Sequence, residues 1–402
     1  MPRLLLTNGL IFDGTGAETS TGDLVIEDGL IVELGQDLDA DEAIDCGGKL
    51  VTPGIFDCHV HFMVDGDFSH TAYVTTPFSL HFYLAAERMR RTLTAGVTSV
   101  RDAGGCDLGV KEACEGGLIP GPRMQISLTM ISQTGGHGDR WEVCGACVPG
   151  MMSPHPGRPH NVVDGPDEMR TKVRELVRAG ADVIKCATSG GVISPRSNPQ
   201  HAHFRAEELD VLVAEATAAD LFVMAHAQAT DGVKNAIRAG VRSIEHGVYL
   251  DDEAIEMMIE GGTYLVPTLI APLGVLEAAE AGTDLPASVV DKARSVVDAH
   301  RDSVTRAVAA GVKIAMGTDS GVTRHGENLR ELAEMADVGM NPLDVLASST
   351  SIASELMGLD DEVGILRPGM IADVLVFTND DLDVSDMGSR LETVIQSGRV
   401  VD

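Results

Sequence analysis

A helix-to-strand junction that recurs along the chain constrains the fold more than any other feature. At each junction a helix-like segment ends in small residues and a glycine, and a β-branched strand follows at once; the glycines are Gly96, Gly180, Gly240, Gly262 and Gly311. A glycine just past a helix can adopt the left-handed conformation that closes the last turn. The short loop then leads into a buried strand, and such strands read as nearly continuous apolar runs. Helices that alternate with strands in this way indicate an α/β fold.

The number of strands predicts the architecture. Five strands follow the junctions, and three more are expected at residues 54–61, 123–132 and 221–226. The helices show the matching periodicity, because Leu209, Leu212 and Val213 fall on one helical face with acidic residues elsewhere. Eight such units predict a closed (β/α)8 TIM-type barrel, with a doubly wound open sheet as the competing topology.

The two ends of the chain have a different pattern. Residues 1–53 and 363–402 contain short alternating segments separated by Asn-Gly, Asp-Gly and Pro-Gly turns. Such segments are typical of a small sheet. We therefore expect a small β-sandwich-like domain from residues 1–54 plus 360–402, and a (β/α)8 barrel from residues 55–359.

Composition excludes several classes of partner. The 402 residues carry a net charge of −31, which repels phosphate backbones and anionic lipid, so neither nucleic acid nor membrane is an expected partner. No apolar run is long enough to span a bilayer, and the N-terminal apolar stretch is too short for a secretory signal, so a cytoplasmic location is expected. The seven cysteines are interpreted as reduced thiols. The Cys144 and Cys147 pair is interpreted as incidental or structural, with a metal or redox role as the alternative.

Polar side chains stand where the predicted barrel strands end. His59 and His61 close the first strand, and residues two apart on a strand point to the same face. Four other polar residues each follow an apolar run: Lys185, His226, His246 and Asp319. Barrel enzymes place their sites at the carboxyl ends of the strands.

Each of these residues alone has a simpler structural interpretation. A single histidine at a strand end is more often a hydrogen-bonded structural residue than a ligand. A lysine inside an apolar strand is harder to explain in that way, because burying an ammonium without a partner is costly. The joint occurrence on five strands favours metal binding.

This arrangement resembles the amidohydrolase superfamily over essentially the whole chain, including the terminal motif GILRPGMIADVLVF. The resemblance implies that carbon dioxide carboxylates Lys185 at its side-chain nitrogen, and that this group bridges two divalent metal ions, of which zinc is the usual choice. It also implies that His59, His61 and Asp319 hold one ion, while His226 and His246 hold the other. A metal-bridged hydroxide would attack the substrate, with Asp319 as general acid and base.

Longer motifs are similar to those of the imidazolonepropionase-like group that contains Xaa-Pro dipeptidases and zinc Lys/Arg carboxypeptidases. They are ISQTGGHGD, KCATSGGVISP, HAQATDGVKNAIRAG and IEHGVYLDD. The resemblance implies that His137 and Tyr249 contact the substrate. The loop at Gly190 and Gly191 is a candidate for bringing backbone amides close to the substrate, with a simple turn as the alternative. Three arginines are candidates for pairing with a substrate carboxylate: Arg158, Arg196 and Arg324. Four histidines lie in loops that are expected above the barrel mouth: His155, His160, His201 and His203.

These features predict hydrolysis of an amide bond next to a free carboxylate. The expected substrate is a small molecule, either a dipeptide of the Xaa-Pro or Xaa-Arg/Lys type or an N-acyl amino acid. The first alternative is hydrolysis of another amide, carbamate, lactam or lactone, including a xenobiotic one. The second alternative is a non-catalytic metal-binding scaffold. A homo-oligomer is expected.

Overall fold

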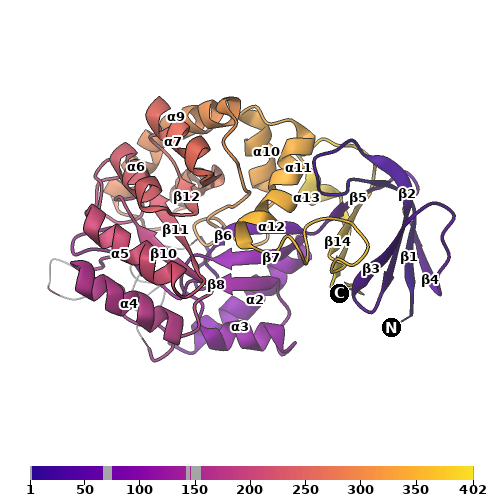
Figure 1. Ribbon diagram of the computed structural model, residues 1–402, viewed down its shortest axis with the longest axis horizontal. Coiled ribbons are helices and arrows are strands. Elements are labelled where there is room, and N and C mark those ends of the chain that lie inside the picture. The colour runs from indigo at the N-terminus through magenta and orange to yellow at the C-terminus, as the bar shows by residue number, and fades with distance from the viewer. Residues whose placement is uncertain (1, 67–74, 142–144, 146–154, 402) are drawn as a thin grey trace.

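The computed structural model describes residues 2–66, 75–141, 145 and 155–401. Helices surround a set of barrel strands, and a separate sheet lies to one side of them (Figure 1). Both chain ends lie in this sheet, beside the barrel helices α11, α12 and α13 (Figure 1). The carboxyl end of the chain therefore returns to its beginning.

The side sheet has eight strands in the order β16-β15-β14-β5-β1-β2-β3, with β4 paired to β1. The strands are β1 (Leu4–Ile11), β2 (Ser20–Glu27), β3 (Leu30–Gly35), β4 (Glu42–Asp45), β5 (Leu50–Pro53), β14 (Val374–Phe377), β15 (Leu391–Gln396) and β16 (Arg399–Val400). The two ends meet where β5 pairs antiparallel with β14, with Val51 opposite Val376. The predicted sheet from both termini is confirmed, and the boundaries at residues 54 and 360 stay predictions.

The barrel strands run parallel to one another. They are β6 (Ile55–Val60), β7 (Val97–Asp102), β8 (Arg123–Ile126), β9 (Met130–Ile131), β10 (Val183–Ala187), β11 (Phe222–Ala227), β12 (Ser243–His246) and β13 (Tyr264–Val266). The predicted strand at residues 123–132 is divided into β8 and β9, because Leu128 between them has a φ of 65°. A left-handed residue of this kind cannot continue a strand.

The last barrel position, at residues 313–320, closes the ring through single bridges. Leu265 pairs with Ile314 on one side, and Val60 pairs with Ser320 on the other. The Cys58 amide donates to the Met316 carbonyl at 2.9 Å, which joins this segment to β6. The predicted closed barrel is confirmed, and the open-sheet alternative is wrong.

Helices cover the outside of the barrel. They are α2 (Leu80–Thr94), α3 (Leu108–Glu115), α4 (Pro166–Arg178), α5 (Ala206–Thr217), α6 (Thr230–Ala239), α7 (Asp252–Gly261), α8 (Ile270–Glu280), α9 (Ala287–Ala310), α10 (Arg330–Asp337), α11 (Pro342–Ser348), α12 (Ser351–Met357) and α13 (Met387–Arg390). None of those in the described part of the chain is long and apolar enough to cross a membrane.

The glycine junctions adopt the predicted conformation. Gly240, Gly262 and Gly311 are left-handed caps of α6, α7 and α9, with φ values of 93°, 63° and 88°. Gly96 and Gly180 follow the capping alanines of α2 and α4 and also have positive φ values, 92° and 91°. These glycines turn each helix directly into the next strand.

Buried neutral histidines predict a loss of stability in acid. Burial lowers the pKa of His203 and of His300 to about 4. Below the unfolded value of about 6.5, the unfolded chain gains protons that the folded chain does not accept. We therefore expect the free energy of unfolding of the protein to fall as pH decreases from about 6.5 to about 4.

The variant His203→Gln isolates one of these groups. Between about pH 6.5 and about pH 4, the substitution should reduce the slope of the free energy of unfolding against pH by up to about 1.4 kcal/mol per pH unit. Urea unfolding at half-unit pH steps measures the slope, with the exposed His160→Gln variant as the matched control. An unchanged slope in His203→Gln would show that His203 titrates normally in the folded state.

Candidate active site

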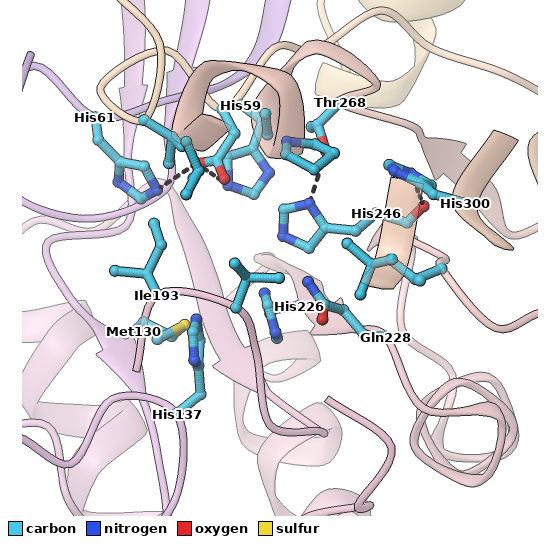
Figure 2. A pocket seen from close by; sticks show the side chains of 18 of the residues that line it. His59, His61, Met130, His137, Ile193, His226, Gln228, His246, Thr268 and His300 are labelled. Carbon is cyan, nitrogen blue, oxygen red and sulfur yellow. Dashed lines mark hydrogen bonds and ion pairs between the residues drawn. The ribbon is translucent and has the colours of Figure 1, made fainter. Parts of the chain in front are cut away.

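The six predicted metal ligands line one cavity. His59 and His61 come from the end of β6, and Lys185, His226 and His246 come from β10, β11 and β12. Asp319 lies near the end of the closing segment at residues 313–320. Figure 2 shows the imidazoles of four of these residues and of His137 turned toward a common space. Parallel barrel strands bring their carboxyl ends to one face, which explains how residues 260 positions apart meet there.

His59, His61 and Asp319 form a compact group whose ligand atoms lie within 4.8 Å of one another. Asp319 Oδ1 is 3.4 Å from His59 Nε2 and 3.2 Å from His61 Nε2. Burial opposes protonation of His61, but contact with Asp319 outweighs it and raises the pKa of this imidazole. A cation is therefore favoured in this position, and two imidazole nitrogens with a carboxylate oxygen suit a divalent metal such as zinc.

A hydrogen bond to one nitrogen of each ligand ring leaves the other nitrogen for a metal. The Nδ1 atom of His59 contacts Glu245, that of His61 contacts the Gly104 carbonyl at 2.8 Å, and that of His246 contacts Thr268 at 2.7 Å. His226 is the reverse case, because its Nε2 atom contacts the Gly190 carbonyl at 3.1 Å. Such partners fix ring orientation and tautomer in metal sites.

Glu245 is a site residue that sequence reasoning missed. It is completely buried, and its Oε2 lies 2.6 Å from His59 Nδ1 while its Oε1 accepts from Arg101 at 3.0 Å and from Ser243 at 2.5 Å. The available signal was an acidic residue inside the buried strand RSIEHG, next to His246. A buried carboxylate needs partners of this kind.

Replacing Glu245 with Gln should weaken metal binding. The amide cannot accept from both His59 and Arg101 with the same strength, so His59 loses the orientation that the carboxylate imposes. We expect metal affinity to fall by about 10- to 100-fold. Competition with a chelator of known affinity measures the change. Glu253→Gln on the exposed end of α7 is the control, and equal affinities in both variants would contradict this positioning role.

Lys185 is a second buried group that needs a partner. Its side chain is 1% exposed, and its Nζ has no hydrogen-bond partner within the described ranges. Burial lowers the pKa of this amine to about 8. A neutral amine is the form that reacts with carbon dioxide, and the carboxylate formed would be an anion beside four histidines. The donor set therefore fits two divalent ions.

His137 also reaches the cavity, and the neighbouring glycines shape its position. Its ring stacks on His226 at a centroid distance of 4.2 Å, and its Nδ1 lies 2.7 Å from Ser194 Oγ. A Cβ on Gly191 would lie 2.3 Å from the His137 ring, and one on Gly190 would lie 2.1 Å from the Asn198 carbonyl oxygen. The glycine pair thus lets the loop pack against the histidines.

The structure places other predicted residues away from the cavity wall. Tyr249 is half-buried and packs against the cluster around Val248, and its backbone amide donates to the Gln228 carbonyl at 3.0 Å. None of the arginines or loop histidines predicted as candidates lines the cavity, whereas Arg140, Gln228 and His300 do. Cys144 and Cys147 lie outside the described residues.

Comparisons with known proteins identify the family. The model of the amidohydrolase family matches residues 50–401. The chain belongs to the amidohydrolase family. Membership in this family identifies the protein as a hydrolytic enzyme. The resemblance expected from the sequence is therefore confirmed.

Individual proteins are similar to this chain in sequence and in fold. Ochratoxinase from Aspergillus niger is 34% identical over 398 residues, which cover 93% of this chain and 81% of the relative. A crystal structure of a Xaa-Pro dipeptidase with bound methionine in its active site has a TM-score of 0.91 at 32% identity and covers 99% of both chains. A prolidase complexed with N-methylphosphonate-L-proline has a TM-score of 0.89 at 35% identity, covering 100% of this chain and 99% of the other.

Proposed function

We propose that this amidohydrolase uses two divalent metal ions, with zinc as the expected metal, to cleave an amide bond next to a free carboxylate. The observation that carries the proposal is the meeting of the His59, His61 and Asp319 group with the orphaned Lys185 amine in one cavity. His226 and His246 line the same cavity and would complete the second metal site with a carboxylated Lys185. The expected substrate is a dipeptide or an N-acyl amino acid.

The comparisons support the substrate class. Methionine and N-methylphosphonate-L-proline, the molecules bound in the two similar structures, both carry a free carboxylate. Dipeptides and N-acyl amino acids share this group. The small molecules bound in these two structures also support a small-molecule substrate, and a homo-oligomer stays a prediction.

Different residues of the chain would carry out proton transfer and substrate binding. Divalent ions bound here would supply Lewis acidity and a water nucleophile near neutral pH. Asp319 would accept a proton from the attacking water and deliver it to the leaving nitrogen, as a general acid and base must. His137, with Nδ1 held by Ser194, keeps Nε2 for a substrate oxygen.

Metal reconstitution and substrate screening test the proposal. The protein stripped with a chelator should lose activity, and zinc with bicarbonate should restore it at two metal equivalents per chain. The restored enzyme should hydrolyse members of dipeptide or N-acyl amino acid libraries and produce the free amino acid. Restored metal content without turnover of any carboxylate-bearing amide would refute the proposal.

A non-peptide amide is a second candidate. The 34% identity to ochratoxinase, which spans 93% of this chain, is the observation that favours it. Turnover of aromatic or cyclic amides, carbamates, lactams or lactones, together with inactivity on dipeptides, would support this candidate over the first.

A further inference from the structure

The cavity has two chemically different walls. One wall carries the predicted metal ligands. The other is aliphatic and contains residues from α8, α9 and the loops beside them: Val192, Val248, Ala271, Val275, Val296 and Val322. These side chains belong to one apolar cluster, so the wall is continuous with a packed core behind it. A wall of this kind favours an uncharged aliphatic group.

The charges that line the cavity are unbalanced. Among its lining residues in the described part of the chain, Arg140 is the one Lys or Arg outside the predicted metal ligands, and the one acidic side chain is Asp319. Asp319 is already committed to His59 and His61. Although the chain has 61 acidic residues, none of those that the structure describes lines this cavity apart from Asp319. A basic substrate side chain would lose its hydration here without gaining a partner.

Arg140 stands outside the group of predicted metal ligands. It follows the His137 loop directly and lines the cavity with that histidine. The residue is half-buried at the cavity. A guanidinium pairs a carboxylate through two parallel hydrogen bonds, which makes it a specific receptor for the anion.

Gln228 supplies an independent observation. It lies two residues after His226, is 6% exposed, and lines the cavity, where Figure 2 shows it near that histidine. Its side-chain oxygen is buried and has no hydrogen-bond partner among the described residues. A buried amide oxygen without a donor is costly, and a substrate N–H would supply one.

We infer that Arg140 binds the substrate carboxylate, that Gln228 accepts from a substrate N–H, and that the aliphatic wall selects an uncharged aliphatic side chain. This inference rests on the proposed amide hydrolysis and narrows its substrate class. It selects N-acyl or aminoacyl derivatives of residues such as leucine, valine or methionine over those of arginine and lysine.

Product binding tests the pocket without catalysis. Calorimetry on the zinc-loaded enzyme compares L-leucine, L-arginine and L-leucinamide. Leucine should bind at least tenfold more tightly than either of the others. Equal affinity for leucine and arginine would overturn the aliphatic selection, and equal affinity for leucine and leucinamide would overturn the role of the carboxylate.

Hydrolysis of matched dipeptides tests the same inference independently. Ala-Leu should have a kcat/KM at least 100-fold above that of Ala-Arg, and at least tenfold above that of the Ala-Leu amide. In Arg140→Gln the preference for the acid over the amide should fall to within about threefold, through KM rather than kcat. Arg294→Gln on the exposed face of α9, where the arginine is 70% exposed, should keep the wild-type preference.

The outcomes separate this inference from the proposed function. Efficient cleavage of Ala-Arg leaves amide hydrolysis established and overturns the aliphatic selection. An unchanged acid preference in Arg140→Gln overturns the assignment of Arg140. If no amide is hydrolysed but leucine retains its binding advantage, the proposed reaction fails and the selectivity of the pocket is supported.

Discussion

Replacing Lys185 with Met should abolish activity and also stabilise the metal-free protein. Under the proposed mechanism the loss should be at least about 1000-fold, because the variant would have no amine to carboxylate and therefore no group to bridge two ions. Methionine is a good apolar substitute for a buried, unbranched side chain. The change removes a buried amine whose pKa burial lowers from 10.5 to about 8, a shift that corresponds to about 3 kcal/mol.

Activity should fall while the stability of the metal-free protein rises, and this combination makes the experiment specific. Urea unfolding of chelator-treated protein should show a gain of up to about 3 kcal/mol at pH 7, and metal analysis should show at most one equivalent bound. Lys313→Met is the matched control, because this lysine is half exposed and paired with Glu355 at 2.8 Å. Two bound equivalents with normal activity in Lys185→Met would refute the bridging role.

Replacing Asp319 with Asn should reduce kcat by about 100- to 10,000-fold, the range expected for losing a general acid and base. Asparagine has the same shape and also tolerates the left-handed backbone that Asp319 adopts at a φ of 58°. The fold should therefore survive, with KM changing much less than kcat.

Steady-state kinetics and metal analysis of Asp319→Asn make this measurement, with Asp291→Asn on the exposed surface of α9 as the control. Activity within threefold of the wild type would favour the non-catalytic metal-binding scaffold. Loss of metal with no loss of fold would assign Asp319 chiefly to binding, because its Oδ1 lies beside both His59 and His61.

The barrel was predictable because its signals are local in sequence. Each helix-to-strand junction depends on one glycine and the residues around it, and Gly96 through Gly311 all adopt the required positive φ. The meeting of the six predicted ligands in one cavity was predictable for a related reason, because residues at the carboxyl ends of parallel strands in a barrel face the same side. The break at Leu128 had no comparable signal, since leucine rarely adopts a φ of 65°.

The parts of the site that were missed depend on contacts between distant segments. Glu245 becomes important only when β7 brings Arg101 to it, 144 positions earlier in the chain. Arg140, rather than the arginines singled out from sequence, lines the cavity because the loop of His137 packs against the loop of Ser194. Strand and helix periodicity carry no information about which loop residue turns inward.

The pairing of β5 with β14 has a consequence for how the chain is made. Val51 leaves the ribosome more than 300 residues before its partner Val376. Strand β5 is followed almost directly by β6, which ends at the predicted metal ligands His59 and His61. During synthesis this edge stays unpaired while the whole barrel emerges. Domains fold largely in the order of synthesis, and exposed strand edges invite aggregation. Pairing of β14 with β5 should therefore be the step at which the nascent enzyme becomes resistant to aggregation and to proteases.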